Sequence, residues 1–162
     1  MRRPRALALA AALAVVAAPA AAAEWGLLIP GTTTMPEVRQ QYGAPTRTDS
    51  PRVDGVETAQ WTYEGAQAPV GMKRLVVDFG LAGPGGLRKD LLRTFRLEPK
   101  PGAFNRQTIV RGWGTPTRVG AEGETPVFVY QQGLIVYFEK DGWRPRLMVF
   151  TPPQPPPPEQ RR

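Results

Sequence analysis

Two close pairs of carboxylates, Glu122 with Glu124 and Glu139 with Asp141, are the main acid–base groups that this sequence offers. Two carboxyl groups that converge on a bond in a cleft can hydrolyse a glycoside. Both pairs fall in predicted turns, where charged side chains usually face water. The chain has no His and no Cys, and its single serine, Ser50, has no histidine to activate it. We therefore predict no catalytic residue, and a carboxylate-dependent hydrolase is the less favoured alternative.

The same composition bears on metals, cofactors and redox chemistry. Without Cys there is no disulfide, thiolate zinc site or iron–sulfur cluster, and without His the commonest metal ligand is absent. We expect neither a metal nor a cofactor. A glycine-rich stretch at 83–86 could cradle a phosphate, but no Gly-Lys-Ser/Thr follows it, so a hairpin tip is the better interpretation.

Residues 1–23 have the pattern of a secretory signal peptide. Three arginines precede an apolar run from Ala6 to Ala18, and small residues follow up to Ala23. The run is shorter than the roughly 20 residues that cross a bilayer. We predict cleavage near Ala23, which gives a soluble periplasmic or secreted protein.

The expected partners follow from this location and from the charge. The formal net charge of the whole chain is +7, and three of the arginines leave with the leader. The remaining mildly basic chain predicts weak contact with an anionic membrane surface at most, and no nucleic-acid partner.

A short motif occurs twice: Gly43-Ala44-Pro45-Thr46-Arg47 returns as Gly114-Thr115-Pro116-Thr117-Arg118. A residue suited to cap a helix N-terminus, Thr34 or Asn105, precedes each copy. Glycine followed by proline is typical of a helix end. Each half therefore begins with a predicted helix of about two turns.

Alternating apolar residues after each helix predict three strands per half. In the first half they surround Trp61 and Tyr63, 74–79 and 91–97, and in the second half 127–130, 134–138 and 146–150. We predict an α+β fold of two tandem repeats, each a short helical segment followed by a three-stranded antiparallel meander, with the helices on one sheet face. The repeats span 24–98 and 99–150, and a disordered Pro-rich tail spans 151–162.

The phase of the strands separates a covered face from an opposite one. The covered face should hold Trp61, Tyr63, Leu75, Val77, Phe79, Phe128, Tyr130, Leu134, Val136 and Phe138. On the opposite face the first half is polar, whereas the second half is apolar. That second half presents Val127, Val129, Ile135 and Tyr137, with Trp143 and Arg144 at the adjacent hairpin.

An apolar sheet face of this size is usually packed against something, and two interpretations of what covers it stay open. Either the first half or a loop packs on it as internal core, or a partner protein binds there, since Trp, Tyr and Arg are enriched at binding hot spots. The six residues are our candidate protein-binding site.

Several motifs of the first half carry a family resemblance. Ile29-Pro30-Gly31-Thr32, Tyr42-Gly43-Ala44-Pro45, Trp61-Thr62-Tyr63 and Leu75-Val76-Val77-Asp78-Phe79 resemble the SmpA/OmlA family, which includes the BamE outer-membrane assembly lipoproteins. The tandem arrangement is similar to the β-lactamase inhibitor protein. The resemblance implies a non-catalytic cell-envelope protein that acts as a protein-binding or scaffold module. The alternative it implies is a secreted inhibitor of an extracytoplasmic enzyme.

Overall fold

A computed structural model describes residues 21–155 of the chain, so most of the predicted signal peptide and the end of the Pro-rich tail lie outside the described residues. The elements are, in chain order, α1 (Met35–Tyr42), β1 (Arg47–Asp49), β2 (Arg52–Val53), β3 (Val56–Glu57), β4 (Gln60–Glu64), the 3-10 turn η1 (Gly65–Gln67), β5 (Met72–Gly83), β6 (Gly86–Pro99), α2 (Arg106–Trp113), β7 (Arg118–Glu122), β8 (Thr125–Val129), β9 (Leu134–Phe138) and β10 (Pro145–Phe150).

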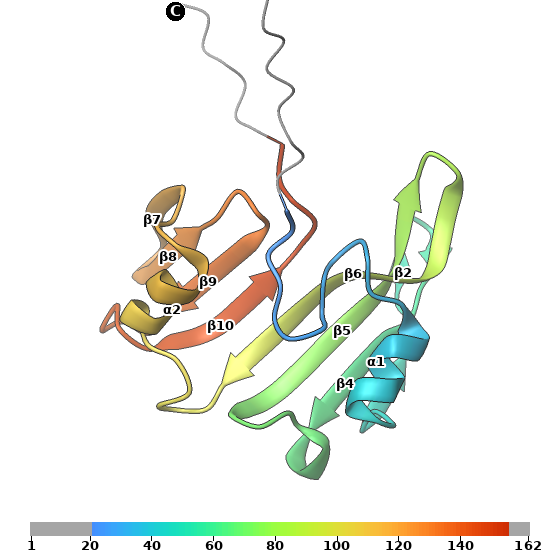
Figure 1. Ribbon diagram of the computed structural model, residues 1–162, viewed down its shortest axis with the longest axis horizontal. Coiled ribbons are helices and arrows are strands. Elements are labelled where there is room, and N and C mark those ends of the chain that lie inside the picture. The colour runs from blue at the N-terminus through green and yellow to red at the C-terminus, as the bar shows by residue number, and fades with distance from the viewer. Residues whose placement is uncertain (1–20, 156–162) are drawn as a thin grey trace, which may run out of the picture.

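Eight of the strands form one sheet in the order β1-β4-β5-β6-β10-β9-β8-β7, and β2 and β3 form a separate two-stranded hairpin. Every pairing between neighbouring strands is antiparallel. Figure 1 shows α1 and α2 over the same face of the large sheet, with the N-terminal segment crossing that face between them.

Both helices begin and end where the sequence predicts. The Asn105 side chain accepts the backbone N–H of Thr108 at 2.9 Å, and the Thr108 hydroxyl accepts the N–H of Asn105 at 2.9 Å, which closes a capping box at the start of α2. At α1 the Glu37 carboxylate accepts the Thr34 N–H at 2.7 Å, and the hydrogen bonds from Thr34 lower the pKa of Glu37.

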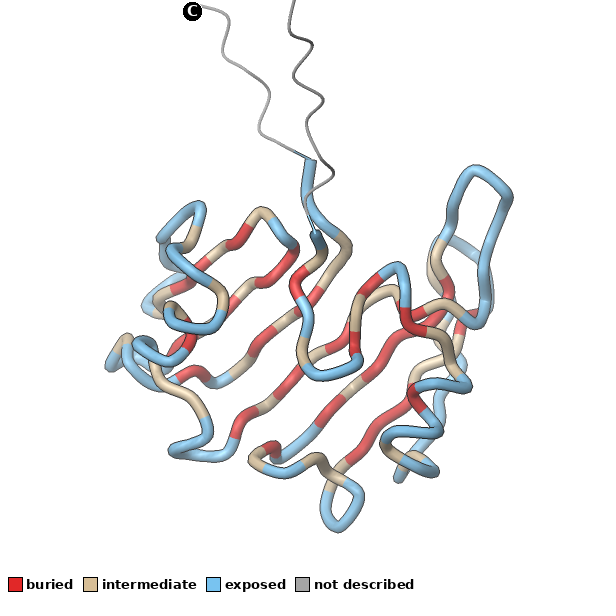
Figure 2. The backbone as a smooth tube through the Cα atoms, in the orientation of Figure 1, coloured by how far each residue is buried: buried red, intermediate tan, exposed pale blue. Residues whose placement is uncertain are grey.

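The core lies between the sheet and this helical face. All ten residues that the strand phase assigns to the covered face are buried. Leu28, which is completely buried, places the N-terminal segment in the same core, and Val38 and Ile109 do so for the two helices. Figure 2 shows the resulting alternation of buried and intermediate positions along the central strands.

One pair of strands joins the two halves of the sheet. Phe150 on β10 lies directly opposite Phe95 on β6, and their rings stack with centroids 4.3 Å apart. Trp113 of α2 meets the Phe150 ring edge-on at 5.9 Å. Aromatic residues of both halves therefore share one core.

The predicted α+β fold of two tandem repeats is wrong. Among the described residues 47% lie in strands and 14% are helical, and one large antiparallel sheet replaces the two separate meanders. The physical reason is that β6, the last strand of the first half, pairs with β10, the last strand of the second. A three-stranded sheet with an eight-residue helix has too little apolar surface to close a core alone, and this merger removes one free edge from each half.

Four of the strands are not predicted from the sequence. Strands β1 and β7 extend the sheet at its two edges, and the β2–β3 hairpin turns through Asp54 and Gly55, both of which have positive φ. All four are two to five residues long, so alternation of apolar residues gives them no clear signal.

The two ends of the described chain are both attached to the turn between β8 and β9. The N–H of Ala23 donates to Gln132 O at 2.8 Å, and Ala23 is buried. The N–H groups of Thr151 and Gln154 donate to Gly133 O and Gln131 O, so the predicted tail is fixed over its first residues. Within residues 21–155, no helix has the length and apolarity needed to cross a membrane.

Candidate functional site

The sheet face opposite the helices differs between its two halves. On β4, β5 and β6 it is polar: the buried Asp78 carboxylate accepts hydrogen bonds from Gln60 Nε2 at 2.6 Å and Thr94 Oγ1 at 3.1 Å, and pairs with Arg96 Nη2 at 3.4 Å. Arg74 bridges two glutamates on the neighbouring strands at about 3 Å. This half is therefore a polar network, in which Thr62 Oγ1 and Arg96 Nε are buried without a hydrogen-bond partner among the described residues.

The other half of this face is apolar, as the strand phase predicts. Val127 lies opposite Tyr137 and Val129 lies opposite Ile135, so these four predicted residues form two adjacent cross-strand rows. β10 continues both rows because Leu147 faces Tyr137 and Val149 faces Ile135. We call the set the open-face patch: Val127, Val129, Ile135, Tyr137, Leu147 and Val149.

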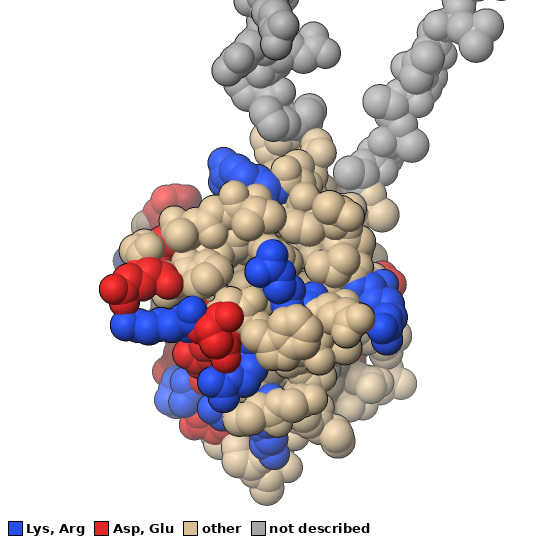
Figure 3. All heavy atoms as spheres, turned by 90° about the vertical axis from the view of Figure 1, so that its left-hand side faces the viewer, with Lys and Arg blue, Asp and Glu red and all other residues tan. Residues whose placement is uncertain are grey.

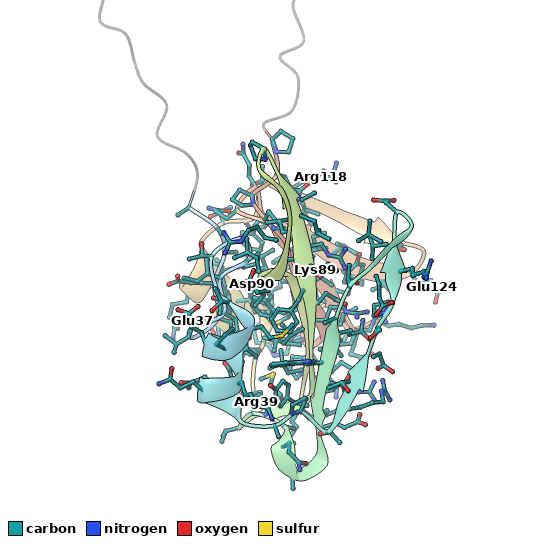
Figure 4. All side chains as sticks on the ribbon, turned by 90° about the vertical axis from the view of Figure 1, so that its right-hand side faces the viewer. Glu37, Arg39, Lys89, Asp90, Arg118 and Glu124 are labelled. Carbon is teal, nitrogen blue, oxygen red and sulfur yellow. The ribbon has the colours of Figure 1, made fainter. Side chains whose placement is uncertain are left out.

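The open-face patch is separate from the core. Val127 is 8% exposed and the other five are half-buried, and none of the six belongs to the buried cluster on the helical face. In the described part of the chain both helices lie on the opposite side of the sheet. Figure 4 views the sheet from its β1 side, with Glu37 and Arg39 of α1 on one side and Glu124 on the other.

A hollow of about 320 Å³ lies over the outer part of the patch. Gly120 of β7 lies opposite Val127, and a Cβ at Gly120 would meet no other atom within 4 Å. The missing side chain opens the row beside Val127 and Tyr137. Arg118 and Glu122, which share the face of Gly120, line the two ends of the hollow.

A cationic group borders the patch at its other end. The Arg146 guanidinium lies 5.8 Å from the centre of the Tyr137 ring, because a bulge in β10 between Pro145 and Leu147 turns Arg146 toward this face. Arg146 also lines a second hollow of about 210 Å³, together with Arg144, Lys73, Glu98 and Glu139.

The structure does not bring Trp143 and Arg144 into the patch. Both lie in the β9–β10 hairpin, where Asp141 Oδ1 accepts their two backbone N–H groups and Asp141 Oδ2 pairs with Arg144 Nε at 2.8 Å. These hydrogen bonds hold the pKa of Asp141 at about 2, and the same pair raises the pKa of Arg144. The carbonyl of Trp143 accepts the N–H of Arg106 at the start of α2, so this hairpin is fixed by structural contacts.

The two carboxylate pairs considered for catalysis do not converge. Asp141 is occupied by its own turn, Glu124 pairs with Lys140, and Glu122 and Glu139 line different hollows. In residues 21–155 no group of three or more acidic side chains is arranged to hold a metal ion.

Four residues that extend the site lie outside the predicted set. Leu147 and Val149 alternate with the buried Met148 and Phe150, so they must face the other side of the sheet. The predicted strand 146–150 therefore already implies that they join the apolar face. Arg118 and Gly120 lie on β7, which was not predicted.

No known protein-family model and no curated protein sequence matches this chain. Its fold is similar to that of a DUF4309 family protein, YjgB, from Bacillus subtilis subsp. subtilis str. 168. That likeness covers 78% of this chain and 82% of that one, with a TM-score of 0.47 and 13% sequence identity. The resemblance to the SmpA/OmlA family and to the β-lactamase inhibitor protein stays a prediction.

Proposed function

We propose that this chain is a non-catalytic module that is exported from the cytoplasm and binds a partner protein through the open-face patch. One observation carries the proposal: six apolar side chains lie in two adjacent rows on the sheet face that no described helix covers. A single exposed apolar residue is ordinary, whereas a contiguous apolar group bordered by charge is typical of a protein interface.

The chemistry of the partner follows from the borders of the patch. Arg146 borders the patch at one end, whereas Arg118 and Glu122 of β7 place charges of both signs at the other end. A partner segment with apolar residues in its centre and a carboxylate at one end would fit these groups. An exported protein with such a surface fits the role of a cell-envelope scaffold, in keeping with the predicted N-terminal leader.

The processing point belongs to the same proposal. Ala23 is 4% exposed and its N–H is bonded to Gln132, so cleavage after Ala23 would remove a buried residue from the fold. We therefore place cleavage one to three residues upstream, within Ala20–Ala22. Mass spectrometry of the exported protein checks this, and a mature chain that begins at Glu24 would contradict it.

Photo-crosslinking tests the binding surface. A benzoylphenylalanine at position 137 replaces one aromatic ring by another, and the full chain is expressed in cells and irradiated. We expect one defined crosslinked protein, which is lost when Ile135→Thr is added. The matched control is Val76→Thr, because Val76 lies on the same sheet face, on the polar half, and is equally half-buried.

Three outcomes decide the test. Loss of the crosslink with Ile135→Thr and its retention with Val76→Thr, with both variants folded, supports the patch as the interface. Loss with both variants, or no crosslink at all from position 137, contradicts it. Unfolding by Ile135→Thr alone would mean that the patch is internal core, since a half-exposed hydroxyl should cost about 1 kcal/mol or less.

A further inference from the structure

Strand β7 is an open edge of the sheet. It pairs with β8 on one side, and all five of its residues are exposed, including Val119 at 59%. In residues 21–155 no other strand pairs with its outer side. Edge strands are usually protected by a central lysine, a proline or a bulge, and the centre of β7 is Val119-Gly120-Ala121 with regular pairing.

The charges of β7 are arranged symmetrically about its centre. Arg118, Gly120 and Glu122 lie opposite Val129, Val127 and Thr125, so they share the face of the open-face patch. When two such strands pair antiparallel about Gly120, Arg118 of each copy stands directly opposite Glu122 of the other. Val119 of each copy then stands opposite Ala121 of the other on the second face.

We propose that a second copy of this chain pairs with β7 through its own β7, which makes an antiparallel two-fold dimer with one continuous sheet. A two-fold interface must be complementary to itself, and the sequence Arg-Val-Gly-Ala-Glu meets that condition in both charge and size. Opposite charges at directly facing positions stabilise a strand pair, and like charges destabilise it.

The ion pairs of the chain favour this edge over the other one. Arg118 and Glu122 form no ion pair among the described residues. At the opposite edge, Arg47 and Asp49 of β1 already pair with each other at 2.8 Å. Figure 3 looks onto the β7 side of the molecule and shows basic and acidic side chains close together on it.

The dimer goes beyond the proposed function and does not depend on it. The two-fold axis at Gly120 would place the two open-face patches on one surface, on either side of the central Arg118–Glu122 pairs. Two partner segments, or one segment that spans both copies, could then bind two apolar patches that are separated by the charged pairs of the two β7 strands.

Sedimentation equilibrium of the exported, processed chain over a concentration series tests the proposal. Glu122→Arg and Arg118→Glu each replace both attractive pairs of the dimer by repulsive ones, so each should weaken dimerisation at least about tenfold. The double variant Arg118→Glu/Glu122→Arg exchanges the charges and should restore the affinity to within a few-fold. Asp49→Arg on β1 is the matched control and should leave it unchanged.

A second variant tests the same dimer interface without reversing a charge. Val119→Lys places a lysine in the centre of the edge and should also give monomers, with an unchanged far-UV circular dichroism spectrum. A monomeric wild-type chain at about 100 μM overturns the proposal. So does a dimer that Glu122→Arg leaves intact, or a double variant that stays monomeric. Because no partner protein is present in this measurement, its failure would leave the crosslinking result untouched.

Discussion

Replacement of Phe150 by alanine tests whether the two halves of the sheet form one cooperative unit. Phe150 is completely buried, stacks on Phe95 at 4.3 Å and contacts Trp113 at 5.9 Å, so the change removes the aromatic contacts at the β6–β10 junction. Loss of a buried phenylalanine costs about 3–5 kcal/mol, part of it from the two ring pairs. That is a large fraction of the 5–15 kcal/mol by which a typical domain is stable.

The assay is native-state hydrogen exchange read separately in two distant strands. Peptides that contain β4 report the first half, and peptides that contain β9 report the second. A loss of 3–5 kcal/mol raises the opening equilibrium at least about a hundredfold at 25 °C, and the slowest amides of both strands should accelerate by the same factor. Phe150→Leu, which keeps most of the apolar volume, should lower the free energy of unfolding by only about 1–2 kcal/mol.

Two results would refute this reasoning. If the amides of β9 accelerate while those of β4 keep their protection, the halves unfold independently and the junction is only a contact between two domains. If Phe150→Ala costs less than about 1 kcal/mol, the stacked pair is not part of a close-packed core.

Three further changes have clear expectations. Asn105→Ala removes the side-chain acceptor for the Thr108 N–H at the start of α2 and should lower the free energy of unfolding, measured by urea denaturation, by about 1 kcal/mol. Asn105→Asp keeps an acceptor oxygen there and should retain most of that stability. Gly133→Ala should destabilise by well over 1 kcal/mol, because φ is +101° and the new Cβ would lie 2.1 Å from Thr151 O. Gly85→Ala, with open space around it, should be neutral, and equal effects of the two would speak against this geometry. The folded-state pKa of Asp141 is about 2, below its unfolded value near 4, so its contribution to stability is present above pH 4 and is lost as the pH falls toward 2. Asp141→Asn should therefore show a smaller loss of thermal stability than the wild type between pH 4 and pH 2, and parallel curves would contradict the assignment.

The sequence predicts the local elements of this protein better than their arrangement. Caps at Thr34 and Asn105 and glycines at the helix ends are interactions between residues close in the chain, so both helices follow from the sequence. Strand alternation likewise places Trp61 and Phe138 on the covered face. The pairing of β6 with β10 is a contact between remote segments, and no local pattern specifies which free edge a strand will choose.

The candidate site shows the same division. Val127, Val129, Ile135 and Tyr137 lie together because register and phase follow from alternation. Closeness in sequence predicts Trp143 and Arg144 beside them, yet the Asp141 turn directs that hairpin toward the start of α2. The contribution of β7 depends on Gly120, whose role is the absence of a side chain, and a residue-type search does not find it.

The attachment of both ends of the described segment to the β8–β9 turn has a consequence for the connectivity of the fold. Ala23 and Gln154 bond to Gln132 and Gln131, which are adjacent residues, so a short linker could join the two ends without crossing the sheet. The β5–β6 hairpin tip at 83–86 is exposed, and a Cβ at any of its three glycines would meet no other atom within 4 Å. A circular permutant opened at that tip should thus fold to the same eight-stranded sheet, with its new termini far from the β8–β9 turn.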